Sequence, residues 1–330
     1  MSVSFHLCVD VSTGQNLIED EIMTRTALIV GVAGRFGRQC ALALQDAGWT
    51  VRGLARSAEK AACIPGVVPI VGDVMDAAVL QKAATGVDVI VQAANPPYQL
   101  WKDQLLALNR GVIDAALAVD AAVVVPQNVY VFPQVGGAWS ETTPRTASHE
   151  LAVLRTAMEN AYRTAAQDRG LNVIALRMGD FIDGPTHRPS GNWFENHITK
   201  AVTDRVFTYP GPMDQNHAWA YLPDAARAVA QLLEQNAHLQ GHIDINFPGW
   251  TLTGAHMQAA IESAIGHPLK TKKMPWPIMK IIALWSPPLR NVVSLRYLWD
   301  VPHHLTSERF NSILPAFKHS DPRDVFVGRW

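Results

Sequence analysis

A glycine-rich turn between two apolar runs constrains this chain more than any other feature. An apolar run over residues 26–30 leads into the turn, which reads Gly31-Val32-Ala33-Gly34-Arg35-Phe36-Gly37, and a helical pattern and a second apolar run follow. A strand that ends in such a turn, with a helix beginning inside it, gathers backbone N–H groups and the positive end of the helix at one point. The segment therefore predicts a phosphate-binding site at the end of the first strand.

The three glycines of this turn have separate predicted roles. Gly31 permits the tight turn, Gly34 lets a pyrophosphate approach the backbone, and Gly37 lets the helix lie close to the strand. The alternative, a tight turn without a ligand, is disfavoured because the turn lies in a strand–turn–helix–strand context. Arg35 and Phe36 lie between the second and third glycines, and we count them with the cofactor-binding residues.

The GxxGxxG spacing resembles the extended and atypical branches of the short-chain dehydrogenase/reductase superfamily, which include NAD-dependent epimerase/dehydratase-like proteins. The alternation of strand and helix patterns over 26–177 itself predicts an α/β fold, a doubly wound parallel (Rossmann) sheet with ligand at the carboxyl ends of the strands. A less regular pattern follows and predicts a smaller C-terminal substrate lobe. The expected divisions are an N-terminal extension (1–23), a Rossmann domain (24–178) and a substrate-binding lobe (179–330) with segments that return to the Rossmann core.

Composition excludes several classes of protein. The chain has 330 residues, of which 48% are hydrophobic and 17% charged, and this suits an enzyme with one large core and a smaller lobe. A net charge of −1 gives no electrostatic reason to expect nucleic acid or an anionic membrane as partner. Three cysteines without metal-ligand spacing, of which Cys40 is expected to be buried, and no secretory signal together favour the cytoplasm. The apolar stretch 278–285 is too short to span a bilayer.

The end of the second strand favours NADP over NAD as cofactor. An NAD-specific site usually has an acidic residue about 20 residues beyond the glycines, where it holds the ribose 2′-hydroxyl. Here the strand ends in Arg56-Ser57 and offers no carboxylate. Arg56, together with Arg35, is therefore predicted to pair with a 2′-phosphate. The alternative is that both arginines are solvated surface residues.

The resemblance implies further cofactor contacts. Asp73-Val74 follows a short strand over 67–71, which we expect to be buried, and matches the acidic–apolar pair that binds the adenine edge in the extended branch. A fourth strand over 87–93 runs into a loop that the resemblance places against the central phosphates and ribose. This loop reads Ala93-Ala94-Asn95-Pro96-Pro97-Tyr98, and a helix over 100–119 is predicted after it.

The residues that typical members use for catalysis are altered at all three positions. These members use a tyrosine, a lysine four residues later and a serine or threonine. Glu159 matches the glutamate that follows the lysine, so that Arg155 stands at the lysine position and Leu151 at the tyrosine position. Counting back from Tyr130 places Pro126 at the serine position. Neither Leu151 nor Pro126 can transfer a proton, whereas Arg155 can hold ribose hydroxyls or a substrate acid but cannot act as a base.

Other residues remain open as proton donors or acceptors, with water as an alternative: Tyr130, Tyr98, Asp180 and His217. Tyr130 and Asn128 lie at the end of the fifth strand, although Tyr130 is equally well explained as a core tyrosine. Asp180 follows the sixth strand beside the expected nicotinamide position and is either a base or a turn former. Tyr98 begins a literal YxxxK pattern with Lys102, in the wrong place for the family motif but on a loop beside the cofactor.

Aromatic residues and histidines beyond the sixth strand predict a substrate pocket. The candidates for substrate binding are Trp193, His217 and Trp219 in this region, together with Tyr98 on the loop beside the cofactor. Such aromatics indicate an apolar or aromatic pocket, although aromatic stripes more often serve packing. Of the twelve histidines, His187, His197 and His217 and the pair His303-His304 lack ligand spacing, so no metal site is expected.

Taken together, these features predict an NADP-dependent oxidoreductase or epimerase-like enzyme of the atypical short-chain type, acting on a small carbonyl or hydroxyl substrate. A non-catalytic dinucleotide sensor is the alternative from a different class. The missing tyrosine and lysine favour the sensor, and the well-developed C-terminal lobe counts against it. An isomerase or lyase that keeps its NADP bound also stays open. The expected partner is a small-molecule substrate, and the resemblance leaves a homodimer open.

Overall fold

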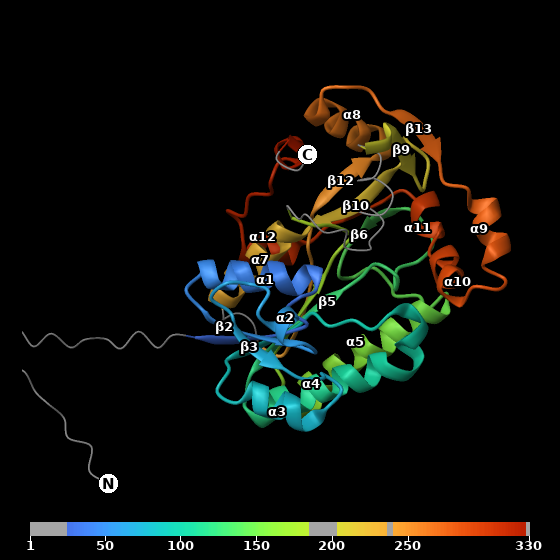
Figure 1. Cartoon of the computed structure of the whole chain (residues 1–330). Coiled ribbons are helices and arrows are strands. Elements are labelled where there is room, and N and C mark those ends of the chain that lie inside the picture. Colours follow the sequence, from blue (N-terminus) through green and yellow to red (C-terminus); the bar gives the residue numbers. More distant parts are fainter. Residues whose placement is uncertain (1–24, 185–202, 236–239, 328–330) are drawn as a thin grey trace, which may run out of the picture.

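The computed structural model describes residues 25–184, 203–235 and 240–327. Its centre is a seven-stranded parallel sheet in the order β11-β7-β5-β4-β1-β2-β3 (Figure 1). The strands are β1 (Thr26–Val30), β2 (Thr50–Ala55), β3 (Val68–Val71), β4 (Val89–Gln92), β5 (Ala122–Gln127), β7 (Val173–Arg177) and β11 (His242–Asn246). Strand order reverses between β1 and β4, so a ligand crevice is expected at their carboxyl ends. The predicted α/β class and doubly wound sheet are confirmed.

Helices cover both faces of this sheet (Figure 1). Because side chains alternate along a strand, Leu28 joins the core beneath α3 (Ala77–Ala84), α4 (Leu106–Ala118) and α5 (Glu150–Arg169), whereas Ile29 joins the core beneath α1 (Arg35–Asp46) and α7 (Leu222–Glu234). Cys40 of α1 is buried in the second core, as predicted. The central strands read as continuous apolar runs because both of their faces are covered.

Strand β3 differs from the prediction. The sequence suggested a buried strand over 67–71, and the strand forms, but three of its four residues are exposed. The reason is its position, because β3 is the edge strand of the sheet and, among the described strands, pairs with β2 alone. A short run of valine and isoleucine predicts a strand equally well at the edge of a sheet and at its centre.

The helix predicted over 100–119 also begins differently. After β4 the chain forms a 3₁₀ turn, η1 (Tyr98–Leu100), then a π-helical turn, η2 (Trp101–Leu105), and only then the regular helix α4. The indole N–H of Trp101 donates to the carbonyl of Pro96 at 2.9 Å and thereby ties the start of the helix back to the proline loop. Single π turns occur often at functional sites, and this one adjoins the crevice.

The remaining elements form a smaller lobe and segments that return to the sheet. Strands β8 (Asp180–Ile182), β10 (Asn216–Tyr221) and β12 (Trp250–Thr253) form one small sheet. A second consists of β9 (Val206–Tyr209) and β13 (Lys270–Lys273), and a third of β6 (Gly137–Trp139) and β14 (His303–Leu305). The other helices are α2 (Ala58–Ala61), α8 (Gly254–Ile265), α9 (Trp276–Ile282), α10 (Pro287–Ser294), α11 (Tyr297–Asp300), α12 (Glu308–Ile313) and α13 (Pro322–Val327). Strand β11 and helix α7 lie beyond residue 178, yet β11 belongs to the central sheet and α7 packs against it.

A buried ion cluster fastens the carboxyl end of the sheet. Arg177 of β7 is fully buried and forms two hydrogen bonds with Glu159 of α5, at 2.9 and 2.8 Å. Arg145 also donates to Glu159, at 3.2 Å, and Asp244 of β11 lies 3.8 Å from Arg177. Arg177 further donates to the backbone carbonyl of Asn128 just beyond β5. A buried arginine is tolerated only when it is paired, so this cluster joins α5, β5, β7 and β11.

Removing the Glu159 carboxylate is expected to destabilise the fold. The Glu159→Gln substitution leaves the buried Arg177 without its bidentate partner and should lower the free energy of unfolding by about 3 kcal/mol, as measured by urea denaturation. Glu150→Gln, an exposed change on the same helix, is the matched control and should cost far less. Equal losses in the two variants would contradict the role given to the cluster.

A comparison of the wild type with Glu159→Gln at several pH values gives a second test. Burial raises the pKa of the Glu159 carboxyl, but Arg177 and Arg145 outweigh this effect, and the net pKa lies below its ordinary value of 4.5. A carboxyl whose pKa is depressed in the folded state contributes its stability fully above the unfolded pKa and loses it as pH falls through the folded pKa. The stability gap between the wild type and Glu159→Gln should therefore shrink as pH falls below 4.5. A gap that does not change with pH would contradict the assignment.

Candidate functional site

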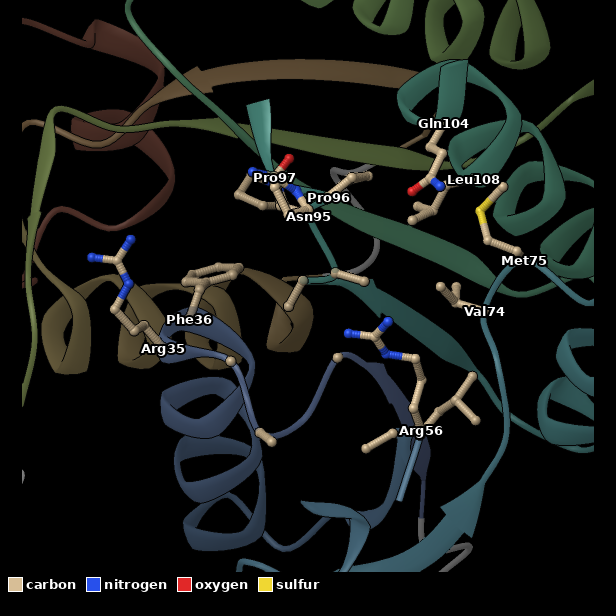
Figure 2. A pocket seen from close by; sticks show the side chains of 18 of the residues that line it. Arg35, Phe36, Arg56, Val74, Met75, Asn95, Pro96, Pro97, Gln104 and Leu108 are labelled. Carbon is tan, nitrogen blue, oxygen red and sulfur yellow. The ribbon is translucent and has the colours of Figure 1, made fainter. Parts of the chain in front are cut away.

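A cleft of about 620 Å³ lies at the carboxyl ends of β1, β2, β4 and β5 (Figure 2). All the residues predicted to bind the cofactor line it, except Gly37: Gly31, Gly34, Arg35, Phe36, Arg56, Asp73, Val74, Ala93, Ala94 and Asn95. Of the predicted catalytic residues, Asn128 and Arg155 line it as well. The structure thus brings together one group of predicted residues from turns that are far apart in the sequence.

The glycine turn is shaped by the absence of side chains. Gly31 has a φ of +85°, a value that L side chains rarely adopt, and a Cβ there would lie 2.8 Å from the backbone nitrogen of Ala94. A Cβ at Gly37 would collide with the carbonyl oxygen of Gly31. Gly37 is therefore absent from the cleft because it packs α1 against the turn, which is the role that the sequence suggested for it.

The amino end of α1 opens into the cleft. Its N-cap residue is Gly34, and within the described part of the chain no side chain caps the first turn of the helix. Ala33, Gly34, Arg35 and Phe36 all line the cleft at this point. Uncapped N–H groups and the positive end of a helix dipole suit an anion, so the residues present fit the diphosphate of a dinucleotide.

Basic residues lie at one end of the cleft. Figure 2 shows the Arg56 side chain extending from the end of β2 into the cleft. Lys60 of α2 lines the same end, as do Asp73 and Val74. Sequence reasoning missed Lys60; the available signal was its place four residues after Arg56, on the short helix that leaves β2.

Arg35 does not join this basic end. Its guanidinium lies 3.8 Å from the carboxylate of Asp183 and 5.5 Å from the ring centre of Phe181. In Figure 2 the Arg35 and Arg56 side chains lie on opposite sides of the glycine turn. The prediction that both arginines meet one 2′-phosphate is therefore not supported for Arg35, because its side chain is directed towards the β8 segment instead.

Arg155 lies in the wall of the other end of the cleft. Its guanidinium lies over the ring of Trp101, 4.7 Å from the ring centre. Burial lowers the pKa of this guanidinium, although the neighbouring Tyr130 and Tyr98 oppose the shift. The buried Nε of Arg155 has no hydrogen-bond partner among the described residues. A buried donor without a partner at a cleft wall fits an acceptor on a ligand, such as a ribose hydroxyl.

Two of the predicted tyrosines form a pair. The hydroxyl groups of Tyr98 and Tyr130 are 2.6 Å apart. Burial raises the pKa of both phenols, that of Tyr130 more strongly, so both are neutral at neutral pH. The backbone N–H of Tyr130 donates to the side chain of Asn128 at 3.1 Å, which fixes the turn after β5. Tyr98 is thus hydrogen-bonded to Tyr130, whereas Lys102 of the literal YxxxK pattern is exposed to solvent.

Asp180 and His217 form a second pair. The Nε2 atom of His217 lies 2.8 Å from the Asp180 carboxylate, and the buried imidazole stacks on Trp299 at 4.1 Å between ring centres. Asp180 raises the pKa of both Tyr98 and Tyr130, which places its charge within electrostatic reach of the tyrosine pair. Sequence analysis assigned separate roles to Asp180 and His217 and did not predict their contact.

Several predicted residues do not line the cleft. Tyr98, Tyr130, Asp180 and His217 lie outside its lining. Trp219 is almost fully buried and packs against Trp299 in the core of the smaller lobe, with 5.7 Å between ring centres, and its contact with substrate stays a prediction. The apolar surface of an indole is satisfied by such packing. Trp193 falls outside the described residues.

Histidines show no metal constellation in the part of the chain that the structure describes. No group of three or more His, Cys, Asp or Glu residues there is arranged to hold a metal ion. The Nδ1 atom of the buried His303 donates to the Val301 carbonyl at 2.8 Å, and burial lowers the pKa of His303 to about 3. The other two histidines considered from the sequence, His187 and His197, lie outside the described residues.

Comparison with solved structures shows what the whole fold is similar to. UDP-N-acetylglucosamine 4-epimerase from Bacillus cereus is 15% identical, with a TM-score of 0.72 over 92% of this chain and 95% of that one. UDP-glucose 4-epimerase from Bifidobacterium longum, in complex with NAD⁺ and UDP, is 14% identical, with a TM-score of 0.70 over 92% and 96%. L-threonine 3-dehydrogenase from Trypanosoma brucei is 15% identical, with a TM-score of 0.69 over 92% and 94%. At these identities the likeness concerns the fold.

Sequence comparison gives the family. A search of curated proteins finds no match. The model of the NAD dependent epimerase/dehydratase family, by contrast, matches residues 27–246, about two thirds of the chain, including the glycine turn and the sheet. This agrees with the resemblance inferred from the GxxGxxG spacing and makes a nicotinamide dinucleotide the class of cofactor. The chain belongs to the NAD dependent epimerase/dehydratase family, and it is an NAD(P)-dependent enzyme of the oxidoreductase or epimerase type.

Proposed function

We propose that this protein is an NADP-dependent oxidoreductase or epimerase-like enzyme that acts on a small carbonyl or hydroxyl substrate. One observation carries the proposal: a single cleft joins an anion cradle at α1 to a basic end at Arg56 and to the wall formed by Arg155. A bound nicotinamide dinucleotide supplies hydride transfer. The chain's own residues supply binding, orientation and proton transfer.

The basic end of the cleft supports NADP. The end of β2 carries Arg56 where an NAD-specific site has a carboxylate, and Lys60 adds a second cation beside it. Two cations suit the 2′-phosphate of NADP better than the neutral 2′-hydroxyl of NAD. This proposal departs from the family name and from the Bifidobacterium longum structure, both of which refer to NAD.

Orientation of the reacting groups falls to Arg155. In typical members a lysine at this position holds the ribose, and the Arg155 guanidinium, with its unpaired Nε at the cleft wall, is suited to the same task. It remains a cation at neutral pH and cannot serve as a base. Arg155 therefore positions ribose or substrate oxygens and does not exchange a proton.

Proton transfer is assigned to the tyrosine pair: neither tyrosine lines the cleft, but Tyr98 directly follows the lining residue Pro97, and Tyr130 is hydrogen-bonded to the lining residue Asn128. Leu151 is buried in the core at the usual tyrosine position and has no proton to exchange. Tyr98 and Tyr130 share a short hydrogen bond, so that a proton donated to a substrate oxygen by one hydroxyl is replaced from the other, which then takes a proton from water. Their raised pKa keeps both hydroxyls protonated at neutral pH, so that each has a proton to donate. Asp180, hydrogen-bonded to His217, is the nearby carboxylate that completes this group.

The sensor remains the rival because Leu151 and Pro126 occupy two of the three usual catalytic positions. A sensor would bind the dinucleotide through the same cradle and would need no proton donor. The two proposals therefore differ in turnover and agree in binding. Tight NADPH binding without oxidation over a broad panel of carbonyl compounds would favour the sensor.

Cofactor preference can be tested at the basic end. Arg56→Ala and Lys60→Ala should each weaken NADPH binding about tenfold, which corresponds to about 1.4 kcal/mol for a lost charge-assisted contact. NADH binding, measured by the same fluorescence titration, should change little. Arg38→Ala is the matched control, because Arg38 is exposed on α1 and lies outside the cleft lining. Equal losses for NADPH and NADH would refute the 2′-phosphate role.

The tyrosine pair can be tested by kinetics on any carbonyl compound that the wild type reduces. Tyr130→Phe and Tyr98→Phe should each lower kcat by about 10²-fold, the usual contribution of a positioned acid, while the dissociation constant for NADPH stays unchanged. Tyr221→Phe serves as the control, since Tyr221 stacks on Trp250 in the smaller lobe. Wild-type turnover in both pair variants would remove the tyrosines from the mechanism.

A further inference from the structure

We propose that a surface around α9 binds the headgroup region of an anionic phospholipid bilayer, so that the enzyme is a peripheral membrane protein. We call this surface the apolar ridge and define it as Ile278, Ile281, Ile282, Leu284 and Trp285. Helix α9 lies at the outer edge of the molecule (Figure 1), and its neighbour α10 contacts η1. The ridge takes no part in the cleft lining, so this proposal is independent of the proposed function.

Five large apolar side chains stand exposed along one short segment. Trp285 is 78% exposed and Leu284 65%, and the three isoleucines are each at least half exposed. Ile278, Ile281 and Ile282 have the i, i+3, i+4 spacing that places residues on one face of a helix. Scattered exposed apolar residues are ordinary, whereas a contiguous group of this kind marks a protein or membrane contact.

The ridge is presented by fixed neighbours. Trp276, at the start of α9, is buried, and its indole N–H donates to the carbonyl of Pro210 at 2.7 Å. Ala283, at the end of the helix, is also buried. Because both ends of α9 are anchored, the exposed isoleucines between them cannot turn inwards without breaking these contacts. The structure therefore holds the apolar side chains outwards.

Charge along the segment of the chain that carries the ridge is of one sign. Residues 263–299 contain no aspartate or glutamate, and they contain Lys270, Lys272, Lys273, Lys280, Arg290 and Arg296. All four residues of β13, three of them lysines, are exposed, and this strand runs directly towards α9. Over the whole chain 28 basic residues are balanced by 29 acidic ones, so the net charge of −1 conceals a strongly basic segment. The expectation of no membrane partner rested on that sum.

One of these cations is fixed against the ridge itself. The guanidinium of Arg290 donates to the carbonyls of Ala283 and Leu284, at 3.4 and 3.2 Å. Its charge therefore lies at the turn that carries Trp285, and Lys280 lies within the ridge segment. Apolar side chains with an exposed tryptophan, flanked by lysine and arginine, are typical of segments that lie in the interface of an anionic membrane. Arg296 is paired with Asp300 at 3.2 Å and contributes less.

A second copy of the chain fits this surface less well. In a two-fold contact the same patch serves both copies, so that the cations of 263–299 would meet a segment with no acidic residue to pair with them. Anionic headgroups supply the missing opposite charge. No helix in the described part of the chain is long and apolar enough to cross a membrane. Contact through a seven-residue helix lying in the interface agrees with that finding.

Vesicle sedimentation with the full-length protein tests the proposal. The protein should sediment with vesicles of phosphatidylcholine and phosphatidylglycerol, far less with pure phosphatidylcholine, and less again at high salt, because the attraction is electrostatic as well as apolar. The double variant Ile281→Ser/Trp285→Ser should lower the partition coefficient at least about tenfold, and Lys272→Glu/Lys273→Glu should act mainly on the anionic vesicles. Val153→Ser, an exposed change on α5, is the control.

Tryptophan fluorescence and sedimentation equilibrium complete the test. Anionic vesicles should shift the emission of the wild type to shorter wavelength, and Trp285→Phe should remove most of this shift. Thermal melts verify that each variant is folded, which the exposure of the substituted side chains makes the expected result. The proposal is overturned if the wild type ignores anionic vesicles, if it binds both vesicle types equally, or if the wild type is a dimer that the Ile281→Ser/Trp285→Ser variant dissociates.

Discussion

The close approach of α1 to the turn after β1 is the constraint on which the rest of the site depends. The helix can begin there only because position 37 has no side chain to strike the carbonyl oxygen of Gly31. Gly31 in turn passes close to the backbone of Ala94, at the end of β4. The turn is thus fitted between two neighbouring strands at the point where strand order reverses. The amino end of α1 is directed into the cleft as a result, and every inference about phosphate follows from it.

The opposite wall of the cleft depends on the buried ion cluster. Glu159 and Arg177 hold α5 against the ends of β5 and β7, and Arg177 also holds the backbone at Asn128. Arg155 lies one helical turn before Glu159 on α5, and its side chain lines this wall of the cleft. The usual tyrosine position, one further turn back, is filled by the buried Leu151. Phenolic hydroxyls come instead from Tyr98 and Tyr130, which the turns after β4 and β5 bring together.

Local patterns in the sequence were enough to predict the sheet, the glycine turn and the basic residue at the end of β2, because each depends on residues close in the chain. The Tyr98–Tyr130 and Asp180–His217 contacts could not be predicted in this way, since each joins loops on different strands. The exposure of β3 and the burial of Trp219 were also missed. An apolar residue type indicates that a side chain tends to be buried. Whether it is buried depends on where its strand or helix lies in the fold, which local sequence does not show. The net charge also gave no indication of the basic segment around α9, because a charge summed over the whole chain does not show where the charged residues lie.

The central claim is that the cleft holds a nicotinamide dinucleotide with its diphosphate at the amino end of α1. A crystal structure of the protein soaked with NADPH measures this directly. We expect nucleotide density along the cleft, with the diphosphate on the amides that follow Gly34 and the 2′-phosphate within hydrogen-bond distance of Arg56. Density that places the nucleotide elsewhere, or an empty cleft at saturating NADPH, would contradict it.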